Sequence, residues 1–256
     1  ALMGENGAGK STLIKILTGV YSKDGGTVAF DGREIAPANS LEAQKLGISP
    51  IYQEISLVSQ LSVAENIYIG REIKKNGMID WKTTNQKSEE LLNSLGIQID
   101  VTKPLSSYGT AIQQMVAIAR SILIEAKLVI MDEATSSLDE DEVEVLFDII
   151  RKLKKKGIAI LFISHRLPEI FQITDTVTVL KDGFLVGEYE TASLTKKDLV
   201  SKMIGRSAED IVEVHRQKRQ IQEELYLKAE VIESGIKLRG LNLTIRKGEI
   251  VGLAGL

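Results

Sequence analysis

Apolar residues recur along this chain in two patterns, one typical of helices and one typical of buried strands. In residues 10–20, "KSTLIKILTGV", four apolar residues follow helical spacing: Leu13, Ile14, Ile16 and Leu17. Residues 127–133, "KLVIMDE", and 158–165, "IAILFISH", are instead short apolar runs that end in polar residues. Such runs are typical of strands in a buried parallel sheet.

Turn signals divide the remaining segments. Residues 25–35, "GGTVAFDGREI", predict a hairpin with Asp31-Gly32 as its turn. Residues 41–54, "LEAQKLGISPIYQE", predict a helix, then Gly47, then a strand in which Pro50 indicates an edge position or an irregular ladder. Residues 55–125 are expected to be mostly helical, and "TVTVLKDGFLVGEYE" predicts a final hairpin. This alternation predicts an α/β fold.

Composition narrows the class of protein. The 32 basic and 35 acidic residues give a net charge of −3, so no overall basic field indicates nucleic acid. The chain has no cysteine, which excludes disulfides and thiolate metal sites and agrees with a cytosolic protein. No apolar run approaches the roughly 18 residues of a membrane span.

The two ends of the chain suggest a tandem repeat. Residues 206–225 are dense in charge and indicate a linker or a solvated helix. Further on, "LAGL" (253–256) aligns with "LMGE" (2–5), so that two glycines coincide. We therefore expect a first domain at 1–206, a charged linker at 207–235 and the start of a second domain at 236–256.

The strongest chemical signal is a phosphate-binding loop. Gly4-x-x-x-x-Gly9-Lys10-Ser11 is the pattern in which glycine N–H groups turn around phosphate oxygens at the start of a helix. Lys10 would reach the β- and γ-phosphates, and Ser11 would bind Mg²⁺. The alternative is a glycine-rich turn before a helix. The predicted nucleotide-binding residues are Gly4, Glu5, Asn6, Gly7, Ala8, Gly9, Lys10, Ser11 and Thr12.

Polar residues at strand ends supply candidate catalytic groups. Asp132 would hold Mg²⁺ and Glu133 would polarise the attacking water, whereas the alternative is a solvated acidic pair. His165 could contact the γ-phosphate or orient the water, although a structural histidine is the alternative. Gln53 could add an amide oxygen to the Mg²⁺ shell. The loop favours the catalytic interpretation, because ligands bind at the carboxyl ends of parallel strands.

In this order, the loop, Gln53, "LVIMDEATSSLD" and "FISH" resemble an ABC-type ATPase. The stretches "GENGAGKSTLIKILTGV", "YQEISLVSQLSVAENIYIGRE", "GMIDW" and "ISHRLPEIF" are similar to the ATP-binding subunit of bacterial ribose-, galactose- and xylose-type importers. The resemblance covers about residues 1–206 and again 236–256. It implies a P-loop NTPase core with an antiparallel β subdomain and a helical subdomain at about 55–125.

The resemblance also implies roles and partners. Lys10 and Ser11 bind ATP and Mg²⁺, Asp132 ligates Mg²⁺, and three residues act in catalysis and coupling: the carboxylate Glu133, the switch histidine His165 and the sensor Gln53. Asp139 would lie between two ABC domains. The expected partners are membrane permease subunits contacted by the helical insertion, a second ABC domain and, indirectly, a periplasmic sugar-binding protein. Nucleic acid is not an expected partner, and the expected location is the cytoplasmic face of the membrane.

One segment departs from the family. A Leu-Ser-Gly-Gly-Gln-like signature normally precedes a helix, but this chain has "PLSSYGTAIQQMVAIAR". Alignment on "QQMVAIAR" puts Gly109 at the serine and Thr110-Ala111 at the two glycines. Alignment on Leu105-Ser106 leaves three residues too many. Gly109 lacks a hydroxyl and Ala111 adds a Cβ, so the segment is altered unless its backbone N–H groups suffice.

Two other functions compete with sugar import. One is a soluble tandem ABC ATPase acting on ribosomes or DNA, which would typically need basic arms or long coiled coils. The other is a regulatory domain whose hydrolysis has faded, which only the altered signature supports.

Overall fold

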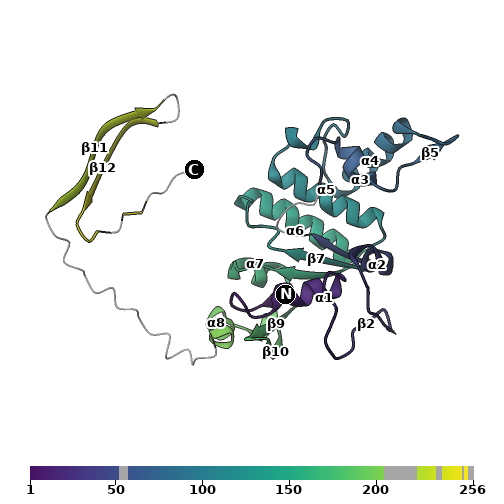
Figure 1. Cartoon of the computed structure of the whole chain (residues 1–256), viewed down its shortest axis with the longest axis horizontal. Coiled ribbons are helices and arrows are strands. Elements are labelled where there is room, and N and C mark those ends of the chain that lie inside the picture. The colour runs from purple at the N-terminus through teal and green to yellow at the C-terminus, as the bar shows by residue number, and fades with distance from the viewer. Residues whose placement is uncertain (52–56, 205–223, 235–237, 250, 253–256) are drawn as a thin grey trace. The chain divides into compact units, whose positions relative to one another are not determined.

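The computed structural model describes residues 1–51, 57–204, 224–234, 238–249 and 251–252 (Figure 1). Its internal contacts divide the chain into two compact units, Ala1–Ala208 and Glu209–Leu256.

The first unit alternates helices and strands, as the two apolar patterns predict. Its helices are α1 (Lys10–Leu17), α2 (Ser40–Leu46), α3 (Val63–Tyr68), α4 (Trp81–Leu95), α5 (Thr110–Leu123), α6 (Glu140–Lys155), α7 (Leu167–Ile173) and α8 (Lys196–Ile204). Its strands are β1 (Leu2–Met3), β2 (Ala29–Phe30), β3 (Arg33–Glu34), β4 (Ile48–Ile51), β5 (Lys74–Lys75), β6 (Met78–Ile79), β7 (Leu128–Asp132), β8 (Ala159–Ile163), β9 (Thr176–Lys181) and β10 (Phe184–Glu190). Short 3-10 turns lie at Leu105–Ser107 and Thr191–Ser193.

Two three-stranded sheets form the framework of the site. In the sheet β4-β7-β8 all strands are parallel, and Asp132 pairs with Ile163 at the end of the β7–β8 ladder. The predicted parallel strands are therefore confirmed, as is the edge position of the strand that contains Pro50. In the sheet β1-β9-β10, β1 runs parallel to β9, and β9 forms the predicted hairpin with β10.

Helices α5 and α6 bury apolar faces next to the parallel sheet. Helix α6 begins with a capping box, in which the Asp139 carboxylate accepts from the Glu142 N–H and the Glu142 carboxylate accepts from the Asp139 N–H. Its buried residues recur at helical spacing: Val143, Leu146, Phe147, Ile149, Ile150 and Leu153. Phe147 packs edge-to-face on Phe162 of β8, with ring centroids 6.1 Å apart.

The tight turns of two hairpins are formed by residues with positive φ angles. The predicted hairpin β2–β3 turns at Asp31 and Gly32, whose φ angles are 51° and 74°. Residues 57–125 contain α3, α4 and α5, but also a β5–β6 hairpin that the helical expectation missed. Its turn, Asn76-Gly77, has the same left-handed geometry. Among the described residues, no helix combines the length and apolar character needed to cross a membrane.

The second unit contains an antiparallel pair, β11 (Leu225–Ser234) and β12 (Leu238–Arg246). Leu225–Ser234 belong to the segment expected as linker, 207–235, and form a strand, whereas the division of the chain into domains stays a prediction. The charged residues of this segment masked an alternation of apolar side chains, at Leu225, Leu227 and Ala229, that suits a strand. Residues 205–223, which include most of the expected linker, lie outside the described residues.

The phosphate-binding loop lies so close to β9 at Gly4 that no space remains there for a side chain. A Cβ atom built on Gly4 would lie 2.4 Å from the Leu180 carbonyl oxygen and 2.9 Å from the Ala8 Cβ. We expect Gly4→Ala to lower the free energy of unfolding by about 1–3 kcal/mol, as overpacking does, which corresponds to several degrees in Tm. Gly25→Ala is the matched control, because no atom lies within 4 Å of its Cβ position. Equal melting temperatures for the two variants would contradict the crowding at Gly4.

Candidate functional site

The segment Gly4–Gly9 connects β1 to α1, and the predicted binding segment continues to Thr12 in the first turn of the helix. Gly9 occupies the N-cap of α1 with a φ of 100°, a conformation that suits glycine, and no side chain of the described residues caps this helix. The first N–H groups of α1 therefore lack a capping acceptor and carry the positive end of the helix dipole. This arrangement is a favourable place for phosphate oxygens.

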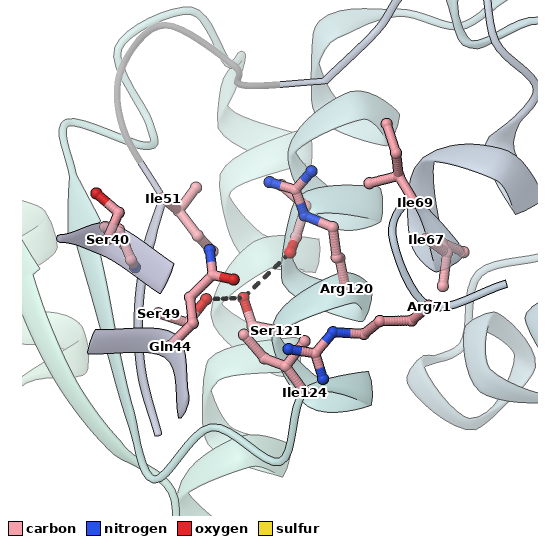
Figure 2. A pocket seen from close by; sticks show the side chains of 12 residues that line it. Ser40, Gln44, Ser49, Ile51, Ile67, Ile69, Arg71, Arg120, Ser121 and Ile124 are labelled. Carbon is pink, nitrogen blue, oxygen red and sulfur yellow. Dashed lines mark hydrogen bonds between the residues drawn. The ribbon is translucent and has the colours of Figure 1, made fainter. Parts of the chain in front are cut away.

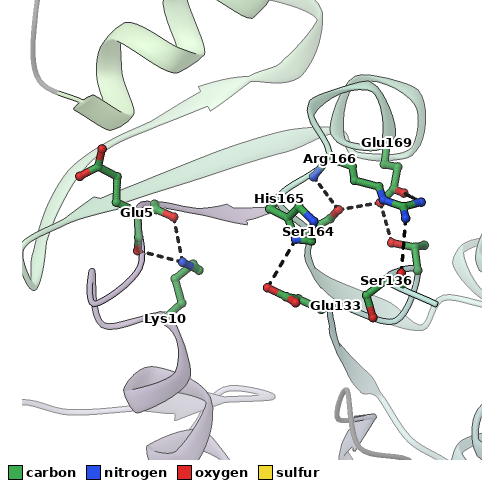
Figure 3. A network of polar contacts seen from close by, with 10 residues as sticks. Glu5, Lys10, Glu133, Ser136, Ser164, His165, Arg166 and Glu169 are labelled. Atoms are coloured by element: carbon green, nitrogen blue, oxygen red, sulfur yellow. Dashed lines mark hydrogen bonds and ion pairs between the residues drawn. The ribbon is translucent and has the colours of Figure 1, made fainter. Parts of the chain in front are cut away.

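Lys10 folds back over its own loop. Its Nζ donates to the Gly4 carbonyl oxygen at 2.8 Å and to the Glu5 carbonyl oxygen at 3.0 Å (Figure 3). The ammonium group is thus held inside the curve of the loop by neutral acceptors. A phosphate would offer it stronger, charged acceptors.

Asp132 and Glu133 follow at the carboxyl end of β7. Asp132 is half-buried, and its pKa is raised above the ordinary value, first by burial and then by the Glu133 carboxylate, whereas Lys10 partly offsets the rise. Because Lys10 and Asp132 interact electrostatically, the phosphate-binding loop and the end of β7 belong to one site. Sequence reasoning predicted this juxtaposition.

Glu133 adopts an unusual backbone conformation for a residue that is not glycine. Its φ is 51°, and its N–H donates to the Ile163 carbonyl oxygen at 2.9 Å. Backbone in this region costs of order 1–3 kcal/mol and persists where the surroundings fix it. The β7–β8 ladder thus continues one bond past the last residue of β7.

His165 follows β8 and meets Glu133. The imidazole Nδ1 lies 3.6 Å from Glu133 Oε1 (Figure 3). The His165 side chain is 66% exposed and the Glu133 side chain 31%, so both remain accessible to a reactant. The parallel strands therefore bring together two side chains that lie 32 residues apart in the chain.

The residues for a magnesium ion are partly defined. Ser11 is exposed in the first turn of α1, and Asp132 supplies a carboxylate near Lys10. Within the described parts of the chain, no group of three or more histidine, aspartate or glutamate residues could hold a metal alone. A hydroxyl with one carboxylate suits Mg²⁺, which keeps several waters and binds substrate phosphates. Gln53, the third predicted ligand, lies outside the described residues.

The altered signature segment lies at the start of α5. Gly109 is the N-cap of this helix, in agreement with the alignment on "QQMVAIAR", and no side chain of the described residues caps it. Ala111 is 5% exposed and packs in the hydrophobic core, so its Cβ is directed inward rather than toward a ligand. Tyr108 is held by a hydrogen bond from its hydroxyl to the Asp100 carbonyl oxygen, at 2.8 Å.

Sequence reasoning missed one part of the site, a buried polar cluster around Glu169. The carboxylate accepts hydrogen bonds from the Thr135 and Ser164 hydroxyls and pairs with Arg166. A glutamate between apolar residues in "HRLPEIF" was the available signal. Asp139, expected between two ABC domains, caps α6 in this chain, and the expected contact stays a prediction.

Comparisons with known proteins agree with this geometry. The ABC transporter family matches residues 1–136. The galactofuranose transporter ATP-binding protein YtfR of Escherichia coli strain K12 is 44% identical over 260 residues, which cover 100% of this chain and 51% of that protein. The ribose import ATP-binding protein RbsA 1 of Rubrobacter xylanophilus is 46% identical over 255 residues, which cover 100% and 50%. The chain thus spans about half the length of the curated relatives it matches.

Solved structures show the same fold. A part of the ABC transporter complex cbiONQ from Clostridium perfringens is 26% identical with a TM-score of 0.65, over 80% of this chain and 82% of that chain. An ATP-binding cassette of an ABC transporter reaches a TM-score of 0.69 at 24% identity, over 80% and 85%. The predicted P-loop, ABC-type fold is confirmed, and so is the resemblance to sugar-import ATP-binding proteins. With 136 of its 256 residues matched by the family and 44–46% identity to these relatives over its whole length, the chain belongs to the ABC transporter family.

Proposed function

We propose that this chain binds ATP with Mg²⁺ and hydrolyses the nucleotide to energise import of a sugar through a membrane permease. The observation that carries the proposal is the meeting of three elements in one site: Lys10 acts on Asp132, and Glu133 lies 3.6 Å from His165. The sugar-import names of the relatives support the transported class. Neither of these relatives is named for a role on ribosomes or DNA.

The phosphate-binding loop supplies affinity. The N–H groups at the start of α1 would bind phosphate oxygens, and Lys10 would exchange the Gly4 and Glu5 carbonyls for the β- and γ-phosphates. Gly4, Asn6, Gly7, Ala8 and Thr12 complete the predicted binding segment. Ser11 and Asp132, with Gln53, would hold Mg²⁺, which neutralises charge on the phosphates.

The strand ends supply the hydrolytic groups. Glu133 would accept a hydrogen bond from the attacking water and orient it toward the γ-phosphate. His165, on the neighbouring strand end, would contact the γ-phosphate or the same water. The exposure of both side chains leaves space for these reactants.

A groove gives this site a route to a membrane partner. It lies between the α2–β4 segment and the helices α3 and α5, and its cavity volume is about 360 Å³ (Figure 2). Isoleucine side chains and the guanidinium group of Arg71 line it, which suits an amphipathic permease segment that carries a carboxylate. Ser49 Oγ donates to Ser121 Oγ at 3.0 Å and fixes β4 to α5 beneath the groove.

Strand β4 would transmit a change in the groove to the nucleotide. Ile51 lines the groove and pairs with Met131, which precedes Asp132. Gln53, proposed as the sensor, follows this strand directly in sequence. We place the chain at the cytoplasmic face of the membrane, beside permease subunits that receive sugar from a periplasmic binding protein.

A second ABC domain would complete the nucleotide sites. The first domain at 1–206, the linker after it and a second domain from residue 236 remain our proposed division of the chain. The segment around Gly109 would face the phosphate-binding loop of the second domain rather than Lys10. Since Gly109 has no hydroxyl, that second site would rely on the N–H groups at the start of α5.

Two substitutions separate binding from hydrolysis. Lys10→Ala removes a charged donor to the phosphates, so we expect ATP affinity to fall by about 10- to 100-fold, as a charge-assisted hydrogen bond is worth ~1.5–3 kcal/mol. Glu133→Gln keeps the shape but removes the carboxylate, so we expect retained ATP affinity and an ATPase rate about 100- to 10,000-fold lower. Calorimetry and steady-state ATPase assays with the permease measure the two effects.

Matched exposed variants outside the helical insertion, Lys155→Ala on α6 and Glu188→Gln on β10, should change neither quantity. The assignment of separate roles fails if Glu133→Gln and Lys10→Ala lose ATP affinity equally. It fails also if Glu133→Gln hydrolyses ATP at the wild-type rate.

Asp132 links stability to pH. Because its pKa is raised from the ordinary 3.8, the ionised carboxylate opposes folding, and stability falls as the pH rises through the range in which it ionises. We expect Asp132→Asn to raise the Tm of the nucleotide-free protein at pH 7 and to have no such effect below pH 3.8. When ATP is bound, the variant should also lose the additional stabilisation that Mg²⁺ provides. Asp148→Asn, which changes a surface pair with Arg151, is the control. A lower Tm for Asp132→Asn at pH 7 would show that burial of this carboxylate is not destabilising.

A further inference from the structure

The Glu169 carboxylate joins the two segments that carry the hydrolytic pair. Glu169 lies in the first turn of α7 and is 6% exposed. One of its oxygens, Oε2, accepts from Thr135 Oγ1 at 2.7 Å and from Ser164 Oγ at 2.6 Å. Figure 3 shows the carboxylate beside the turn that bears His165.

The two donors flank the reacting side chains in sequence. Thr135 is two residues beyond Glu133, and Ser164 immediately precedes His165. Both are almost fully buried, at 1% and 4% exposure. Hydrogen bonds in such surroundings are costly to leave unmade, so the shared oxygen holds the end of β7 and the end of β8 at a fixed separation.

Arg166 closes the network from the solvent side. Its Nη1 lies 3.4 Å from Glu169 Oε1, and its Nη2 donates to the Ser136 carbonyl oxygen at 3.4 Å. Its backbone N–H donates to Ser164 Oγ at 3.0 Å, so this hydroxyl both accepts and donates. The cluster therefore connects the turn after β7 with the turn after β8 through side-chain and backbone atoms alike.

A purely stabilising role explains this arrangement poorly. Well-packed apolar residues often stabilise a core as well as a buried ion pair does, because desolvation of the charges is costly. A polar cluster is better suited to fixing one geometry, and Glu133 needs such support because its φ of 51° is left-handed. The cluster therefore contacts the segment just after Glu133 and the residue just before His165, whose side chains lie 3.6 Å apart.

We propose that Glu169 is a positioning residue that fixes Glu133 and His165 relative to each other through Thr135 and Ser164. The inference rests on the proposed hydrolysis of ATP, in which these two side chains act together. Glu169 itself touches no reactant. Its removal should therefore slow turnover and leave nucleotide binding by the phosphate-binding loop intact.

Two substitutions of Glu169 should lower kcat to different extents. Glu169→Gln retains one oxygen for the two hydroxyls but presents an amide donor to Arg166, so it should weaken only the outer part of the cluster. Glu169→Ala removes both parts. We expect kcat to fall about tenfold or more for Glu169→Ala and less for Glu169→Gln, since displacing a reacting group by ~1 Å can cost about 100-fold. The KM for ATP should stay within about twofold.

A double substitution tests whether Glu169 acts through His165. If it does, Glu169→Ala combined with His165→Ala should be no slower than His165→Ala alone, because coupled residues are not additive. Glu142→Gln is the control, because it makes the same change from carboxylate to amide in the capping box of α6, outside the Glu169 cluster. It should leave kcat unchanged.

A second readout does not depend on turnover. The chain has two histidines, so His165 can be identified in histidine-labelled NMR spectra with the His165→Ala variant. As a single substitution, Glu133→Gln should shift the imidazole signals of His165, because the two side chains are in contact. In the Glu169→Ala background this response should fall to less than half, whereas in Glu142→Gln it should persist.

The outcomes separate the inference from the proposed function. An undiminished NMR response together with wild-type kcat in Glu169→Ala overturns the positioning role. A wild-type protein without ATPase activity overturns the proposed function, and the NMR response then still decides whether Glu169 holds the pair together. A parallel rise in KM for Glu169→Ala would also contradict the inference, because it would indicate damage to the nucleotide-binding loop.

Discussion

The hydrogen bond from the Glu133 N–H to the Ile163 carbonyl oxygen is the constraint on which the site depends. It extends the parallel ladder of β7 and β8 into the turn where the chain leaves the sheet. Because the bond holds Glu133 in a left-handed conformation, its carboxylate stays close to the next strand end, where His165 lies. The Glu169 cluster supports the same two turns from behind.

Electrostatics connect this pair to the phosphate-binding loop. Asp132 and Glu133 are adjacent carboxylates at a half-buried strand end, and burial raises the pKa of Asp132. Lys10 offsets part of that cost while its own donors rest on the Gly4 and Glu5 carbonyls. A nucleotide with a divalent cation would satisfy the lysine and both carboxylates at once. The empty site would therefore be less stable than the site with a bound nucleotide, as expected for a functional site.

Patterns that depend on local sequence predicted most of the framework. The apolar runs of β7 and β8, the helix after Lys10 and the Asp31-Gly32 turn each carry their signal in a few consecutive residues. The pairing of β1 with β9 brings together residues 176 positions apart, and two residues of strand contain no information about the partner. Glu169 was missed for a similar reason, since its donors Thr135 and Ser164 become its neighbours only after β7 and β8 pair. Ala111, which aligns with a signature glycine, packs in the core, and the alignment alone did not indicate this burial.

Amide hydrogen exchange at Glu133 tests the central claim most directly. If the ladder continues into the turn, the Glu133 amide should exchange in the slow class of the buried strand residues Val129, Ile130 and Met131, through the same opening of the sheet. Exchange of Glu133 at the rate of the exposed turn residue Ser137 would contradict the account, because the hydrogen bond to Ile163 would then not hold the turn in place.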